Sequence, residues 1–113
     1  MHHIGVNVRW IAKCKYLNDQ NIGEHSHPFF HYLYVLNGSG QITIDGERFT
    51  FYRDHIYMVP AGVHHEFSTN SHEKLQVMEI KFDIGDDKVC DKVSALPPMM
   101  RVDDVNIKHI LEL

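Results

Sequence analysis

Residues 24–38 read Glu-His-Ser-His-Pro-Phe-Phe-His-Tyr-Leu-Tyr-Val-Leu-Asn-Gly. Successive side chains on a strand point to opposite faces, so the odd-numbered positions of this stretch share one face. That face carries three imidazoles and two aliphatic side chains, at His25, His27, His31, Leu33 and Val35. The even-numbered positions carry other large apolar groups, at Phe30, Tyr32, Tyr34 and Leu36. Because both faces are largely apolar, the pattern predicts a central strand that is covered on both sides.

Composition and charge limit the kind of protein. The chain has 113 residues, 43% of them hydrophobic and 23% charged, which predicts one soluble domain with one core. The net charge of −4 argues against non-specific binding to nucleic acid or to an anionic membrane, and no apolar run approaches the length of a membrane span. The two cysteines, Cys14 and Cys90, form no CxxC motif. We therefore expect reduced thiols and a cytoplasmic location, with a disulfide left open as the alternative.

Short strands separated by turns fill the chain up to residue 83. Residues 6–16 alternate apolar and polar side chains, which predicts a half-buried strand with one apolar face, made of Val6, Val8, Trp10, Ala12, Cys14 and Tyr16. The Asp45-Gly46 pair predicts a tight hairpin turn, and Pro28 predicts a break. Further strands are expected at residues 41–44, 47–51, 55–59, 66–68 and 75–82. About eight short strands without an intervening helix predict an all-β fold over residues 1–83, either a closed antiparallel barrel or a double-sheet jelly roll.

The pattern changes after residue 83. Turn-forming residues follow directly, and Pro97-Pro98 breaks regular structure. Asp103 or Asp104 is a suitable N-cap for a short apolar helix. That helix meets no stop signal before Leu113, so we expect residues 84–113 to be a linker and the start of a longer helical extension.

Four histidines have the spacing of a metal site. His25 and His27 are two residues apart on one strand, about 6.5–7 Å between Cα atoms. His31 shares their face, and His65 follows the turn-forming residues 60–63, so it can approach from a neighbouring strand. Three alternatives stay open: a metal ion ligated by all four histidines, a polar pocket that binds an organic molecule, or histidines that only line the end of the barrel. Imidazole suits a divalent transition metal such as Zn, Ni, Cu, Mn or Fe rather than Mg or Ca. In the first two cases we expect an apolar lining from Leu33, Val35 and Tyr57.

The first part of this region resembles the first motif of the cupin superfamily. That motif is a His-x-His pair, three or four residues, a Glu, six residues and a Gly. Here it reads His25-Ser26-His27, three residues, His31, six residues and Gly38. His31 therefore stands where the family has Glu.

The second cupin motif is matched downstream. It is a Gly, five residues, Pro-x-Gly, two residues, a His, three residues and an Asn. Here Pro60-Ala61-Gly62 and His65 match, Asp54 replaces the first Gly, and Thr69 replaces the Asn. The resemblance implies a jelly-roll barrel whose metal ligands stand at the motif positions, namely His25, His27, His31 and His65.

Among cupins, the sequence is most similar to the N-terminal domain of AraC-type transcription regulators. The similar phrases lie at residues 25–40, 44–46 and 56–67, with a closing strand that ends at residues 80–83. The resemblance implies an effector-sensing domain that binds a small molecule such as a sugar, forms a homodimer and has no catalytic residues. The helix-turn-helix half is not in this sequence, so we expect no DNA binding by these residues alone.

A stand-alone metal-dependent cupin enzyme, such as an isomerase or a dioxygenase, is the alternative. The histidine set favours it, whereas His31 in place of the motif Glu removes an acid–base group. Glu66 alternates away from His65 and is a poor general base, and Cys14 has no evident activating partner. The large side chains at positions 30, 32, 34 and 36 are expected to be covered by C-terminal helices or by a second subunit.

Overall fold

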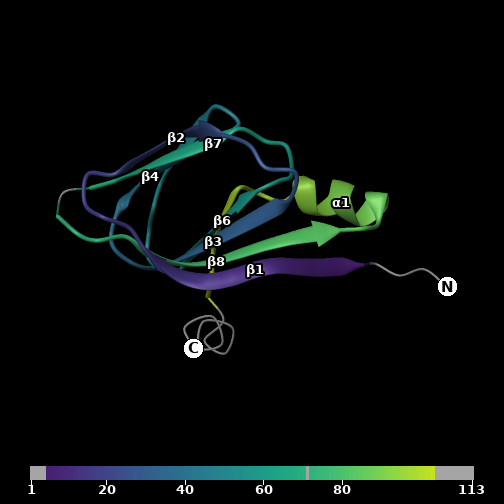
Figure 1. Ribbon diagram of the computed structural model, residues 1–113, viewed down its shortest axis with the longest axis horizontal. Coiled ribbons are helices and arrows are strands. Elements are labelled where there is room, and N and C mark those ends of the chain that lie inside the picture. The colour runs from purple at the N-terminus through teal and green to yellow at the C-terminus, as the bar shows by residue number, and fades with distance from the viewer. Residues whose placement is uncertain (1–4, 71, 104–113) are drawn as a thin grey trace.

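Two antiparallel sheets form the fold in the computed structural model, which describes residues 5–70 and 72–103 (Figure 1). The larger sheet has five strands, in the order β1 (Val6–Lys15), β8 (Gln76–Ile84), β3 (Phe30–Asn37), β6 (His55–Val59) and β9 (Met99–Arg101). The smaller sheet has four, in the order β2 (Asn21–His25), β7 (His65–Thr69), β4 (Gly40–Ile44) and β5 (Glu47–Thr50). This arrangement confirms the all-β jelly-roll prediction.

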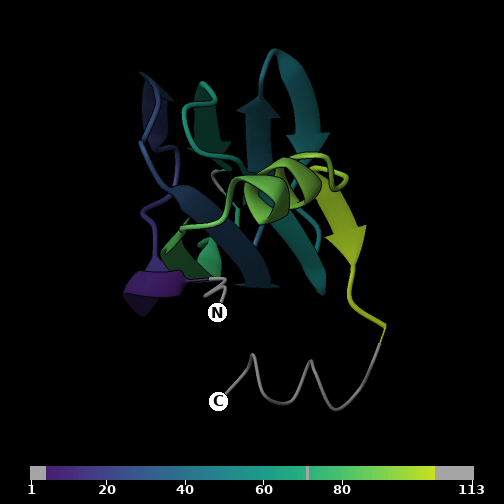
Figure 2. The same ribbon diagram turned by 90° about the vertical axis from the view of Figure 1, so that its right-hand side faces the viewer.

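The core lies between the two sheets, which stand as separate layers in the end-on view of Figure 2. β3 supplies Leu33 and Val35, which are fully buried, and they pack with inward side chains of the smaller sheet such as Ile42 and Phe67. The outer side of β3 is also covered, because Phe30 and Tyr34 are only 3% and 2% exposed. The central strand predicted from the apolar pattern on both faces is therefore confirmed.

A short helix, α1 (Asp87–Ser94), packs against the outer side of the larger sheet and lies in front of the strands in Figure 2. Cys90 and Val93 of this helix pack against a second core cluster that contains Phe30, Met58 and Phe82. The Asp86 side chain caps the helix, since its Oδ1 accepts a hydrogen bond of 3.0 Å from the backbone N–H of Val89. Cover of this face by C-terminal helices or by a second subunit was predicted, but α1 and β9 themselves were not. The helix expected after Asp103 or Asp104 lies outside the described residues, and the division of the chain at residue 83 stays a prediction.

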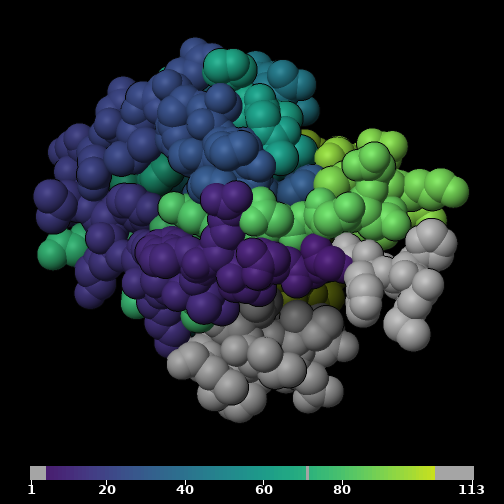
Figure 3. Space-filling view, turned by 45° about the vertical axis from the view of Figure 1, so that its right-hand side comes forward, coloured from purple at the N-terminus to yellow at the C-terminus, as the bar shows by residue number. Residues whose placement is uncertain are grey.

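A bulge divides β1 into two parts that face different layers. The register runs Val8 opposite Phe82 and then Trp10 opposite Lys81, so Arg9 is the extra residue. Cys14 and Tyr16 therefore point to the inner core, whereas Val6 and Val8 point to the outer side. The single apolar face expected for residues 6–16 was wrong, because one extra residue reverses the alternation. Figure 3 shows β1, in purple, along the surface of the sheet.

Val6 and Val8 join an outer apolar face, defined here as the side chains of Val6, Val8, Tyr32, Ile80, Phe82 and Ile84. These side chains and two residues of α1, Val89 and Val93, line one hollow. Val6 and Val8 are 58% and 56% exposed, so α1 covers only part of this face.

Two turns fix the strand pairing around the core. Asp45 and Gly46 have φ angles of 50° and 81°, as the predicted type I′ hairpin between β4 and β5 requires. Gly38 has a φ of 93° and lies directly against the backbone of Lys74 and Leu75, where a Cβ would collide. Among the described residues, no helix is both long and apolar enough to cross a membrane.

Candidate metal centre

Three histidines converge at one end of the barrel. His25 closes β2, His65 opens β7, and the two residues are paired across the sheet. His27 follows in the loop after β2. One ring nitrogen from each histidine lies within 4.8 Å of the others, and the ring centroids are 4.1 Å (His25–His65), 4.6 Å (His25–His27) and 5.1 Å (His27–His65) apart. This is a donor set that one transition metal ion can accept.

Backbone carbonyls orient two of these rings. Nδ1 of His25 lies 2.8 Å from the carbonyl oxygen of Gly23, and Nδ1 of His65 lies 3.2 Å from that of Val63. When each Nδ1–H donates to its carbonyl, Nε2 keeps a free lone pair. Nε2 of His65 is buried and has no hydrogen-bond partner within residues 5–70 and 72–103. A buried acceptor without a partner costs about 1–3 kcal/mol, and a ligated metal ion would satisfy it, so the residues fit a metal.

The electrostatics favour neutral imidazoles at this site. Burial lowers the pKa of His65 to about 4; the bond to the Val63 carbonyl opposes this shift, and the neighbouring histidines add to it. Burial also lowers the pKa of His27, with smaller contributions from the charges of His25, His31 and Lys81. His65 and His27 are therefore neutral at pH 7, the form that binds a metal ion.

His31 lies beside this group and contacts a carboxylate through one ring nitrogen, while its Nδ1 is buried without a partner among the described residues. It is 4% exposed, and its Nε2 lies 2.6 Å from Oε1 of Glu79 on β8. Its ring centroid is 6.0 Å from that of His27 and 6.1 Å from that of His65. The structure thus brings together three of the four predicted ligands, and it gives His31 a carboxylate partner. Ligation by His31 stays a prediction.

Glu79 is the buried acid that sequence reasoning missed. Besides His31, it accepts a hydrogen bond of 2.6 Å from the hydroxyl of Tyr16. Burial by itself raises the pKa of Glu79, but hydrogen bonds from His31, Cys14 and Tyr16 outweigh burial and lower the pKa to about 2. A signal was present in the sequence, because Glu79 stands two residues after Val77 and therefore shares its inward-facing side of the strand.

Cys14 belongs to the same buried network. Burial raises the pKa of its thiol to about 12, and the Glu79 carboxylate adds to the shift. The thiol is therefore protonated at pH 7, in agreement with the expectation that Cys14 is a poor nucleophile.

The three predicted lining residues pack within the core. Leu33, Val35 and Tyr57 are fully buried in the cluster between the sheets. The hydroxyl of Tyr57 donates to the carbonyl of Thr50 at 2.6 Å and accepts from the backbone N–H of Tyr52 at 2.8 Å. These contacts give all three a structural role, and their contact with a bound molecule stays a prediction.

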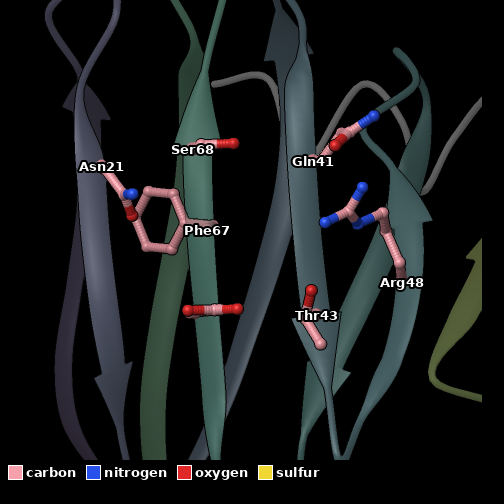
Figure 4. A pocket seen from close by; sticks show the side chains of 7 residues that line it. Asn21, Gln41, Thr43, Arg48, Phe67 and Ser68 are labelled. Atoms are coloured by element: carbon pink, nitrogen blue, oxygen red, sulfur yellow. The ribbon is translucent and has the colours of Figure 1, made fainter.

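A separate polar hollow lies on the outer face of the smaller sheet (Figure 4). Gln41 and Thr43 of β4 and Arg48 of β5 line it, together with Glu66 of β7. Glu66 thus points to the opposite side of β7 from His65, as its place in the alternation predicted. It does not join the histidine site.

Comparison with known proteins identifies the fold family. The cupin domain family model matches residues 14–81, more than half of the chain. Similar solved structures include a predicted oxalate decarboxylase from Thermotoga maritima, with 19% identity, a TM-score of 0.63 and coverage of 69% of this chain and 68% of that one. An RmlC-like cupin from Shewanella frigidimarina has 16% identity, a TM-score of 0.62 and coverage of 73% and 71%.

The polyketide cyclase RemF from Streptomyces resistomycificus is also similar, with 16% identity, a TM-score of 0.61 and coverage of 71% of this chain and 58% of that one. At these identities the likeness concerns the fold alone. No curated protein matches the chain significantly. The matched family model, the two motifs and the two-sheet jelly roll together show that this chain belongs to the cupin family.

Proposed function

We propose that this cupin binds a divalent transition metal ion through His25, His27 and His65 and takes up a small molecule beside it. One observation carries the proposal: His25, His27 and His65 each place a ring nitrogen within 4.8 Å of the others, and Nε2 of His65 is buried without a partner among the described residues. Three protein ligands leave coordination positions open for a bound molecule. Zn, Ni, Mn and Fe all accept such a site, and neutral imidazoles do not favour Mg or Ca.

Metal analysis of untagged protein, purified without a nickel column, tests this proposal. We expect one zinc ion per chain after zinc is added, and a loss of affinity of about 100-fold or more in both His27→Ala and His65→Gln. His64→Ala is the matched control, because His64 is the exposed neighbour of His65 and pairs with Glu24 at 3.4 Å instead of joining the group. Equal affinity in all four proteins, or no binding by any of them, would refute the metal centre.

In a cell, the proposed role of this domain is effector sensing within an AraC-type transcription regulator. The phrase-level similarity of residues 25–40, 44–46 and 56–67 supports this role. The domain would act as a homodimer, and the partly exposed outer apolar face offers a surface for a second copy. Effector binding would shift the population between two arrangements of the regulator. Both cysteines are free thiols, which is in keeping with the cytoplasmic location proposed here.

Two measurements test the sensor role. Light scattering is expected to give a dimer, and fluorescence anisotropy is expected to give no sequence-specific DNA binding by residues 1–113 alone. A monomer at all concentrations would argue against the dimer, and tight specific DNA binding would refute the assignment of DNA binding to a separate domain.

The second candidate is a metal-dependent enzyme, such as an isomerase or a dioxygenase. Open coordination positions favour it, and structural neighbours include proteins named as a predicted oxalate decarboxylase and as a polyketide cyclase. The occupied carboxylate of Glu79 weighs against it, since His31 and Tyr16 already hold both oxygens. Turnover of a candidate substrate by wild type, lost in His27→Ala, would favour the enzyme over the sensor.

A further inference from the structure

Lys81 occupies the inner face of the larger sheet next to the histidine group. It is paired with Trp10 on β1 and with His31 on β3. Its ammonium nitrogen lies 4.5 Å from the centroid of the Trp10 ring and 5.9 Å from that of the Phe29 ring. Contacts of a cation with two aromatic faces hold the ammonium in one region instead of leaving it free in solvent.

Phe29 connects this lysine to the metal centre. The Phe29 ring stacks on His27, with 4.7 Å between the ring centroids and 5° between their planes. His27 and the ammonium of Lys81 therefore both contact one aromatic ring. The charge of Lys81 also contributes to the lowered pKa of His27, which places the two groups in the same electrostatic environment.

Apart from these ring contacts, the positive charge of Lys81 has no ion-pair partner among the described residues. The two acids that flank it on the same face of β8 have other partners: Glu79 is held by His31 and Tyr16, and Asp83 is held by Arg9 at 2.5 Å. Lys81 is half-buried beside the proposed metal centre, and its neighbouring acids are already paired. Its ammonium group is therefore suited to bind the negative charge of a ligand.

We infer that Lys81, positioned by Trp10 and Phe29, is the anion-binding group of this site, and that the bound molecule is a small organic carboxylate. The inference rests on the proposed function, because the carboxylate would lie between Lys81 and the three histidines. A single ammonium suits one carboxylate group, and the two aromatic rings suit an organic body. A phosphate group would call for several donors.

Trp10 provides a direct readout, because it is the only tryptophan in the chain. Its fluorescence is followed while malonate is added to zinc-loaded and to zinc-free protein, with malonamide as the neutral control. Calorimetry of the same titrations gives a second measurement that does not depend on Trp10. The test variants are Lys81→Met and Lys81→Gln. Lys88→Met is the control, because it removes the same charge from an exposed position on α1.

We expect malonate to bind wild type and Lys88→Met equally, and both Lys81 variants about tenfold more weakly, or about 1.4 kcal/mol. Malonamide should not bind. Equal malonate affinity in wild type and both Lys81 variants overturns the inference, whatever the zinc content. Tighter binding of inorganic phosphate than of malonate overturns the carboxylate assignment. If the protein takes up no added zinc but still binds malonate in a way that depends on Lys81, the inference is supported and the metal centre is refuted.

Discussion

The buried carboxylate of Glu79 gives the sharpest test of the interior of the barrel. Glu79→Gln keeps the size of the side chain and removes its charge. In wild type, the two oxygens accept hydrogen bonds of 2.6 Å from His31 and from Tyr16. The glutamine amide has only one oxygen, so its NH₂ group would face one of these donors. One buried donor is left without an acceptor, and the favourable charge is lost.

The size of the effect follows from the pKa. The network lowers the pKa of Glu79 from 4.5 to about 2, which at 1.36 kcal/mol per unit corresponds to about 3 kcal/mol of stability near pH 7. Breaking one partner of a buried, hydrogen-bonded charge independently gives about 3–5 kcal/mol. We therefore expect Glu79→Gln to lower the free energy of unfolding by about 3 kcal/mol at pH 7.

The pH dependence has a definite sign. Because the folded pKa is below the unfolded one, the contribution of Glu79 is complete above about pH 5 and falls as the pH drops toward 2. The difference between wild type and Glu79→Gln should narrow by about 2 kcal/mol between pH 7 and pH 3. His65 contributes to the pH dependence of both proteins. Because its folded pKa of about 4 lies below its ordinary value, the free energy of unfolding decreases as the pH falls below about 6.5. This contribution is the same in wild type and in Glu79→Gln, so it cancels in their difference.

Urea unfolding in the presence of EDTA, followed by circular dichroism, provides the assay. Glu73→Gln is the matched control, since Glu73 is exposed in the loop before β8 and its change should cost less than about 0.5 kcal/mol. A loss below about 1 kcal/mol for Glu79→Gln at pH 7, or a difference that does not change with pH, would refute the account of this network.

Three further predictions concern local features. Gly38→Ala should lower the melting temperature much more than Gly46→Ala in thermal unfolding, because both need a positive φ but only Gly38 lies against the Lys74 carbonyl. Asp86→Ala should cost about 1 kcal/mol in urea unfolding through loss of the α1 N-cap, and restoration by Asp86→Ser would separate capping from charge. Cys14 should resist iodoacetamide at pH 8 in folded protein and react in guanidinium, as measured by mass spectrometry, because its thiol pKa is about 12; rapid labelling of the folded form would contradict this.

Much of the barrel was predictable because its strands follow simple alternation. The odd and even positions of residues 24–38 identified β3 as a strand buried on both faces, and the burial of Leu33 and Phe30 agrees. The Asp45-Gly46 pair identified its turn, since few residues adopt a positive φ at both positions. Both signals are local, so a single sequence contains them completely.

The missed features depend on contacts between distant segments. His31 and Glu79 are 48 residues apart, and their hydrogen bond requires the register between β3 and β8, which no local pattern gives. The bulge at Arg9 could not be recognised in the sequence. Val8 and Trp10 are two residues apart and read as one apolar face, although the register change turns them to opposite sides of the sheet. α1 has only eight residues, too few for a helical period to stand out from the turns around it.

Because of the bulge at Arg9, the two parts of β1 contribute to different sides of the sheet, and each part can change by mutation without the other. After the bulge, Trp10 lies opposite Lys81 and Cys14 packs on the inner core, whereas Val6 and Val8 belong to the outer apolar face. Loss of a single codon at Arg9 would restore an unbroken register and turn Val6 and Val8 to the other side of the sheet. One small deletion would thus remove two apolar side chains from the outer apolar face, while His25, His27 and His65, which lie on other segments, would keep their sequence.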